Sequence, residues 1–419
     1  MEGLRSASAA CQYIADRLGD EKFTLIDVGC SGGIDPIWRV FGRNLRAFGF
    51  DPNIAECERL SATEKLPGVK HVAAFVGLPA DDPIVQARAQ RPYVQRSPWN
   101  RLSVARTVAI RQTRKTSRSQ EQLTAENLWN EVPLADPAAP IILPQFFSAN
   151  SLDDIDIIKI DVDGPDFDIL QSLSSSIGRY KVLALGLEVN FVGSADATDN
   201  TFCNTDRFMR AHGFELFALS VRPYSLAALP ARFQLPFPAQ TQYGRPLQGD
   251  ALYARDLGQP NHPDVSEGIR PAKLAKLAAI FAAMGLFDCA AEVFLTHRER
   301  IRTILDVDVV LDLLCAEAQG SHQPTLSYKD YMVAFEDDAA MFYPSAPTTA
   351  GMSGDFDNLG PKSREVDSLR ERLAAAETAM RAAQGEAEAL KNSTSWRLTR
   401  PLRSSVDFVR RAKFSSTSH

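Results

Sequence analysis

The stretch over residues 23–53 constrains the fold of this chain more than any other, because its pattern is strand, turn, helix and second strand. Phe23–Val28 is a short apolar run with β-branched members, which is typical of a central strand in a parallel sheet. A turn with three glycines follows, and glycine lets a backbone turn sharply and approach a ligand closely. An Asp-Pro pair then favours the start of a helix. Residues 45–50 form the second expected strand, and Asp51 ends it at the edge where open α/β sheets bind ligands.

Two classes of ligand could use this unit. A dinucleotide fingerprint needs G-x-G-x-x-G and an acid about 20 residues later. Asp51 has a suitable spacing from Gly29, but Ser31 and Ile34 stand where the second and third glycines should be. The pattern is instead D-x-G-x-x-G-G, which begins at Asp27. A third interpretation is an α/β turn that binds no ligand.

The D-x-G-x-x-G-G pattern resembles motif I of S-adenosylmethionine-dependent methyltransferases. In that class the glycine turn passes under the methionine part of the cofactor, and the acid after the second strand holds the ribose hydroxyls. The resemblance implies a set of cofactor-binding residues at the ends of the strands. They are Asp27, Gly29, Cys30, Ser31, Gly32, Gly33, Asp51, Asn53 and Asp161.

The rest of the first 258 residues continues the alternation of strands and helices. Helical spacing in residues 8–20 predicts a helix beside the first strand. Further strands are expected over residues 69–76, 155–162, 182–191, 214–220 and 252–255, with helices over residues 55–64, 166–173 and 205–212 and a loop over residues 131–144. This order predicts an α/β protein with a Rossmann-like, doubly wound sheet and a late antiparallel hairpin.

Several pieces of this region occur in the order seen in FkbM-like methyltransferases. They are LIDVGCSGG, FGFDPN, IDIIKIDVDG, LALGLEVNFVG, RFMRAHGFELFAL and GDALYARD. The resemblance covers roughly residues 23–257 and implies a class I methyltransferase domain over residues 21–258, after an N-terminal helix within residues 1–20. In the family a glutamate or glutamine often stands at the position of Asp163, and Pro165 is a further departure.

Methyl transfer to a hydroxyl is an in-line displacement that depends on positioning and is helped by a base or a metal. Three acids lie at the carboxyl ends of the fourth and fifth strands and share the edge of the sheet with the glycine turn. We predict that Asp161 faces cofactor and substrate, and that Glu188 or Asp163 lies closest to the acceptor. Grouped carboxylates also suit Mg²⁺, whereas no histidine is placed by a motif for a zinc site.

Charge is distributed unevenly along this chain of net charge −6. Residues 86–120 form a basic insertion, with no acid between Arg88 and Arg118. It is either a solvated helix face or a segment that attracts an anionic substrate such as a phosphorylated sugar, and nucleic acid is not expected. Six widely spaced cysteines indicate reduced thiols, and Cys30 is expected to fill a tight space. No secretory signal or membrane span is recognisable, so we expect a cytoplasmic protein.

The C-terminal third has a different character. Residues 259–342 are expected to form a helical extension packed on the sheet, and residues 343–363 a flexible linker. Residues 364–392 show a heptad pattern that predicts a coiled coil and a homodimer, with a docking helix or a solvated helix as alternatives. Residues 393–419 form a basic tail with Trp396, suited to peripheral contact with the inner membrane face unless it is disordered.

Together these features predict an S-adenosylmethionine-dependent O-methyltransferase that acts on a sugar hydroxyl. The string SWRLTRPLR is similar to one found in bacterial enzymes of surface-polysaccharide assembly, which favours a glycan acceptor, lipid-linked or anionic, over a secondary metabolite. The alternatives are an NAD-dependent oxidoreductase and a non-catalytic scaffold with a methyltransferase fold.

Overall fold

The structure is a computed structural model, and it describes residues 8–89, 133–162, 164–224, 244–259, 268–319 and 326–337. The chain divides into two compact units, Met1–Ala346 and Pro347–His419. The second unit lies wholly outside the described residues. The expected linker, coiled coil and basic tail therefore lie outside them too, as does the basic insertion after residue 89.

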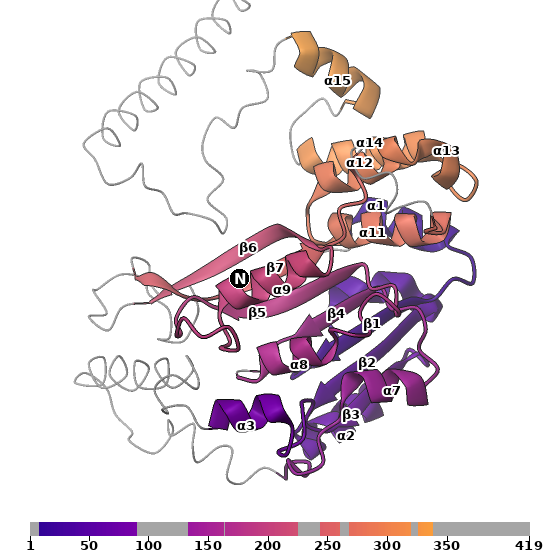
Figure 1. Ribbon diagram of the computed structural model, residues 1–419. Helices are drawn as coiled ribbons and strands as arrows, with labels where there is room; N and C mark the ends of the chain where they lie inside the picture. The colour runs from indigo at the N-terminus through magenta and orange to yellow at the C-terminus, as the bar shows by residue number, and fades with distance from the viewer. Residues whose placement is uncertain are drawn as a thin grey trace, which may run out of the picture. The chain divides into compact units, whose positions relative to one another are not determined.

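A seven-stranded sheet forms the centre of the first unit, in the order β3-β2-β1-β4-β5-β7-β6 (Figure 1). All described strands run parallel except β7, which pairs antiparallel with β5 and β6. The strands are β1 Phe23–Val28, β2 Leu45–Asp51, β3 Val69–Ala73, β4 Ile157–Ile160, β5 Ala184–Asn190, β6 Glu215–Tyr224 and β7 Arg245–Ala254. The predicted doubly wound α/β fold with a late antiparallel hairpin is confirmed.

The order of the strands reverses direction between β1 and β4. From β1 the chain moves outward to β2 and β3, then crosses back to place β4 on the other side of β1. Val28 is in register with Phe50 of β2 and with Ile160 of β4, so three strand ends lie level. In open α/β sheets such a reversal point opens a crevice at the carboxyl ends of the strands, where ligands bind.

Helices cover both faces of the sheet because the buried strands alternate their side chains between two hydrophobic clusters. Leu25 packs in the cluster with α1 Ala9–Arg17 and η1 Pro36–Asn44, whereas Ile26 packs in the cluster with α7 Leu143–Ala149 and α8 Asp166–Ser172. The remaining N-terminal helices are α2 Ile54–Thr63, α3 Pro83–Ala89 and α9 Phe202–Ala211. The core is therefore divided between the two sides of the sheet.

The helices after residue 268 share the core of α1. They are α11 Pro271–Ala283, α12 Phe287–Thr296, α13 Arg298–Ile301, α14 Val307–Gln319 and α15 Tyr328–Asp337, and α11, α12 and α14 gather beside α1 (Figure 1). Phe281 of α11 also packs against Phe217 of β6, with ring centroids 4.6 Å apart. The helical extension thus packs on one face of the sheet.

Two buried lysines tie α11 to the amino end of β4. Lys273 Nζ donates to Asp156 Oδ1 at 2.7 Å, and Lys276 Nζ donates to Asp156 Oδ2 at 3.3 Å. The backbone N–H of Thr24 in β1 donates to the same carboxylate at 2.8 Å. Since buried charges are costly unless they are paired, these contacts allow α11 to lie on the sheet despite its two lysines.

Several local expectations need correction. The sequence predicts a loop up to residue 144, but α7 begins at Leu143, where a proline in the first turn favours a helix. The third and fourth strands are shorter than expected, and the last strand begins at Arg245 instead of residue 252. The helix after Asp35 is a 3₁₀ helix, interrupted by Gly42.

Candidate functional site

The glycine turn after β1 lies against the end of β4. The backbone of Gly29 has φ +86°, and a Cβ at this position would lie 1.8 Å from the carbonyl oxygen of Asp161. The N–H groups of Gly29 and Cys30 donate to the Phe50 carbonyl at 2.9 and 3.0 Å. Only glycine can occupy this position without moving the backbone, because the β1 turn, β2 and β4 meet here.

The other glycines of the turn have left-handed backbone conformations, and Cys30 packs closely against β2. Gly32 and Gly33 have φ of +85° and +96°, and a Cβ on Gly33 would lie 2.9 Å from the Leu60 side chain. The Cys30 thiol fills the space over Gly49, where a Cβ would lie 2.7 Å from the sulfur. Burial raises the pKa of Cys30, so this thiol is a packing residue, as expected, and a poor nucleophile.

A lysine on β4 holds two carboxylates at this edge. Lys159 Nζ lies 3.4 Å from Asp27 Oδ1 and 3.2 Å from Asp161 Oδ2, and it donates to the Gly29 carbonyl at 3.4 Å. Asp27 is buried, whereas the Asp161 side chain is 37% exposed. Lys159 therefore joins the strand acid, the glycine turn and the exposed carboxylate, although the sequence analysis assigned it no role.

Burial and the neighbouring charges have opposite effects on the pKa values of Asp27 and Lys159. Burial raises the pKa of Asp27, and the Lys159 charge opposes that shift without cancelling it. Burial alone would lower the pKa of Lys159, but the charges of Asp27 and Asp161 outweigh it and raise the pKa. Lys159 is accordingly a fixed positive charge at neutral pH, suited to orienting Asp161 and unsuited to accepting a proton.

Asp51 lies at the end of β2, as predicted, and its side chain is buried. Its Oδ1 accepts a hydrogen bond from the Asn53 backbone at 2.8 Å. Burial raises the pKa of Asp51, and this hydrogen bond opposes the shift. The Asn53 side chain caps α2 by accepting from the Glu56 N–H at 3.0 Å, which explains why asparagine suits this position; its role in cofactor binding stays a prediction.

The side chain of Asp166 fixes the backbone of the loop after β4 through hydrogen bonds. Its carboxylate accepts the N–H groups of Val162 and Gly164, both at 2.9 Å, and Asn200 Nδ2 donates to the Gly164 carbonyl at 3.0 Å. Pro165 holds the N-cap position of the following helix, and Asp166 is the first residue of α8. Asp163, a predicted catalytic residue, lies outside the described residues.

Glu188 on β5 is paired with an arginine that the sequence analysis did not single out. Arg222 Nη1 donates to Glu188 Oε1 at 3.0 Å, and Arg222 Nη2 pairs with Asp250 of β7. Burial alone would lower the pKa of Arg222, but the charges of Asp250 and Glu188 outweigh it and raise the pKa. Only the β5-β7-β6 pairing brings these residues together, so spacing along the chain carries no signal of the contact.

The strand register brings the predicted acids to one face of the sheet. Asp27 is level with Lys159, which is level with Gly186 of β5, and Glu188 follows two residues later on the same face. In the described part of the chain no group of three or more histidine, cysteine, aspartate or glutamate residues is arranged to hold a metal ion. Mg²⁺ binding stays a prediction.

The comparisons with solved structures are distant. A TehB-like S-adenosylmethionine-dependent methyltransferase from Corynebacterium glutamicum is 11% identical, with 59% of this chain and 87% of that chain covered and a TM-score of 0.23. A magnesium protoporphyrin IX methyltransferase from Synechocystis, solved with its cofactor, is 8% identical over 58% and 76% of the two chains, with a TM-score of 0.26. Similarities this weak carry no inference about the reaction.

No curated protein matches this chain. Among the described helices, none is both long enough and apolar enough to span a bilayer.

A family match covers the centre of the chain. Residues 107–216 match the family described as Methyltransferase FkbM domain. The matched span includes α7, β4, α8, β5 and α9, and thus Lys159, Asp161 and Glu188. The glycine turn precedes the span, but it lies against the end of β4. The match supports an FkbM methyltransferase domain over this part of the chain and, with it, a methyltransferase activity.

Proposed function

We propose that this protein transfers a methyl group from S-adenosylmethionine to a hydroxyl, most readily a sugar hydroxyl of a glycan. The observation that carries the proposal is the approach of the Gly29 turn to Asp161, beside Asp51 at the reversal point of the sheet. A turn with no Cβ atoms at Gly29, Gly32 and Gly33 allows a ligand close access to the backbone. These features fit the cofactor that FkbM-like methyltransferases use.

Each residue at this edge has a separate role in the proposed reaction. Asp51 would hold the ribose hydroxyls, because a carboxylate at the end of β2 can accept two hydrogen bonds. The turn residues Gly29 to Gly33 would lie along the methionine part of the cofactor. S-adenosylmethionine, when bound, supplies a methyl group on a positively charged sulfur. Asp27 and Lys159 would keep the turn and Asp161 in place, which matters because in-line transfer depends on alignment.

Acceptor activation is assigned to the carboxylates after β4 and near the carboxyl end of β5. Asp161 is partly exposed and oriented by Lys159, so its carboxylate can face cofactor and acceptor. Glu188 is buried and oriented by Arg222, and a carboxylate that accepts a guanidinium hydrogen bond is a weaker base. We therefore assign Asp161 to positioning the reactants and keep Glu188 and Asp163 as candidates for the acceptor hydroxyl, with Mg²⁺ as a further candidate aid.

The choice of a glycan acceptor rests on the sequence alone. The basic insertion would attract an anionic or lipid-linked sugar, and the basic tail would keep the enzyme at the inner face of the membrane. A homodimer through residues 364–392 belongs to the same proposal. An acceptor among small secondary metabolites remains the alternative.

Mass spectrometry of surface glycans from cells with and without the protein tests the acceptor directly. We expect a difference of one methyl group on a sugar residue. Glycans of equal mass would overturn the glycan assignment, and a methylated small metabolite in the same cells would support the alternative.

A further inference from the structure

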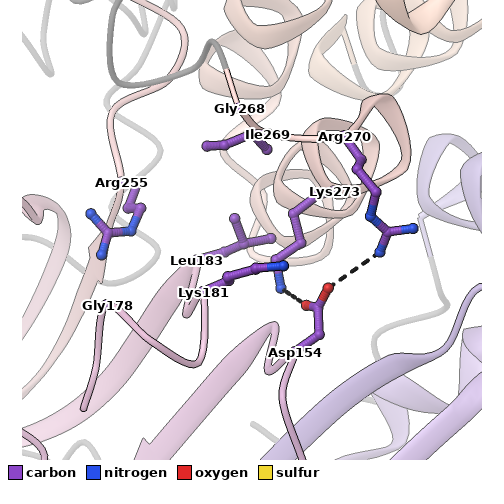
Figure 2. A pocket seen from close by; sticks show the side chains of 9 residues that line it. All are labelled: Asp154, Gly178, Lys181, Leu183, Arg255, Gly268, Ile269, Arg270 and Lys273. Atoms are coloured by element: carbon purple, nitrogen blue, oxygen red, sulfur yellow. Dashed lines mark hydrogen bonds and ion pairs between the residues drawn. The ribbon is translucent and has the colours of Figure 1, made fainter.

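A pocket of about 220 Å³ lies at the amino edge of the sheet, on the side opposite the glycine turn. Its walls come from the segment before β4, the turn before β5, the end of β7 and the start of α11. Figure 2 shows Arg255 on one side of the pocket and Arg270 with Lys273 on the other. The pocket therefore uses none of the residues that the methyltransferase site requires.

Positive charge dominates the lining of this pocket. Four of its side chains are basic, Lys181, Arg255, Arg270 and Lys273, and one is acidic, Asp154. Asp154 already pairs with Lys273 and with Arg270, at 3.2 Å from Arg270 Nη2. Because the single carboxylate is occupied by two cations, it cannot balance the other two.

Arg255 is fixed in place without an acidic partner among the described residues. Its Nε donates to the Val182 carbonyl at 3.0 Å, and its guanidinium lies over the Phe214 ring at 4.4 Å. Burial lowers the pKa of Arg255, and no charged neighbour contributes to the shift. A partly buried guanidinium held in one orientation is preorganised for an anion, since its planar N–H groups match phosphate and carboxylate oxygens.

Lys181 adds a second cation from a constrained backbone. Its φ of +52° is in the left-handed region, which lysine adopts rarely, and its N–H donates to the Gly178 carbonyl at 3.1 Å. The turn between α8 and β5 thus places an exposed lysine on the wall of the pocket. Within the part of the chain that the structure describes, Arg255 and Lys181 pair with no carboxylate, and they line the same pocket from separate segments.

We propose that this pocket binds a small anion of the phosphate class, with Arg255 and Lys181 as its main ligands. A phosphate group offers several acceptor oxygens and more than one negative charge, so it can satisfy both cations at once. The volume is below the roughly 300–1,000 Å³ typical of sites for drug-sized ligands. Inorganic phosphate or pyrophosphate fits that size, as does the phosphate end of a larger molecule whose remainder lies in solvent.

Calorimetric titration of the full chain with inorganic pyrophosphate tests this site, with sodium chloride at equal ionic strength as the salt control. The Lys181→Asn variant removes the charge, and asparagine tolerates the left-handed backbone better than most residues. The matched control is Arg179→Gln, an exposed cation two residues earlier that does not line the pocket. Arg255→Lys keeps the charge but removes the planar guanidinium.

We expect pyrophosphate to bind the wild-type chain and Arg179→Gln equally, and Lys181→Asn to bind about tenfold more weakly, the effect of one charge-assisted contact. Arg255→Lys should also weaken binding. A pyrophosphate titration indistinguishable from sodium chloride, or equal affinity in Lys181→Asn and wild type, would overturn the proposal.

A second titration separates this site from the cofactor edge. Saturating pyrophosphate should leave the affinity for S-adenosylmethionine unchanged, because the pocket lies at the opposite edge of the sheet. Competition between the two ligands would place the pyrophosphate at the carboxyl edge and contradict the proposal. Inorganic phosphate and a nucleoside diphosphate, titrated in the same way, distinguish a free anion from the phosphate end of a larger ligand.

Discussion

At the scale of single residues, the site depends on glycines such as Gly29, where a Cβ atom would clash with a neighbouring segment. The three turn glycines could be identified from the sequence because their spacing is a motif. The reason for Gly29 could not, since the carbonyl oxygen of Asp161 is 132 residues away along the chain and 1.8 Å from a Cβ in space. Lys159 was missed for the same reason: a lysine inside an apolar strand shows no partner until the strands are paired.

We predict that Gly29→Ala lowers the free energy of unfolding by about 3 kcal/mol, the upper range for forcing extra atoms into a packed site. Urea unfolding measures the change. Gly77→Ala is the matched control, because a Cβ at Gly77 would meet no atom within 4 Å. Equal stability of the two variants would mean that β1 and β4 do not approach as described.

Acid should weaken the contact between η1 and the end of α2. Arg39 Nη2 lies 2.8 Å from Glu64 Oε2, and this bond lowers the pKa of Glu64 from 4.5 to about 2. A carboxylate whose pKa is lowered by folding stabilises the folded state fully above the unfolded pKa, and that contribution disappears as the pH falls through the folded pKa. Stability should therefore fall between about pH 4.5 and 2.

Unfolding curves at several pH values test this prediction with two variants. Glu64→Gln should show a shallower loss of stability over that pH range, whereas Glu58→Gln, on the exposed side of α2, should behave like wild type. A pH dependence that Glu64→Gln leaves unchanged would rule out this pair as its source.

At the scale of helices and strands, hydrophobic periodicity predicted the parallel strands and the hairpin well. Buried strands are apolar on both faces, so a short apolar run in the sequence is enough to predict them. The local pattern does not identify their partners: Arg222 on β6 reaches across β7 to Glu188 on β5, and neither residue is close to the other along the chain. The start of α7 was missed because prolines and small residues before it resemble a loop.

The contact between α11 and the sheet is predicted to depend on one buried acid. Asp156→Asn would remove the buried carboxylate that Lys273 and Lys276 share, leaving them only the more exposed Asp154 and Glu21, and breaking a buried ion pair costs about 3–5 kcal/mol. Chemical unfolding should show this loss. Asp153→Asn, an exposed acid three residues earlier, should have little effect, and a loss of equal size in both variants would contradict the assigned role.

At the scale of the whole molecule, the helices α11 to α14 share a hydrophobic cluster with α1 and one face of the sheet, whereas residues 347–419 form a separate compact unit. We predict that deleting residues 364–419 leaves S-adenosylmethionine binding intact. Self-association or partition to anionic vesicles should decrease, because the heptads and the basic tail are removed. Sedimentation and vesicle pelleting measure both, and no change in either would contradict the roles proposed for this segment.

The most direct test of the proposed function is a calorimetric titration of the full chain with S-adenosylmethionine and, separately, with NAD. We predict binding of S-adenosylmethionine, no binding of NAD, and a large loss of affinity in Asp51→Ala, because the ribose hydroxyls lose their carboxylate partner. Unchanged affinity in Asp51→Ala would contradict the role of that residue. Binding of NAD alone, or of neither ligand, would contradict the central claim that the edge formed by Gly29, Asp51 and Asp161 is a methyltransferase cofactor site.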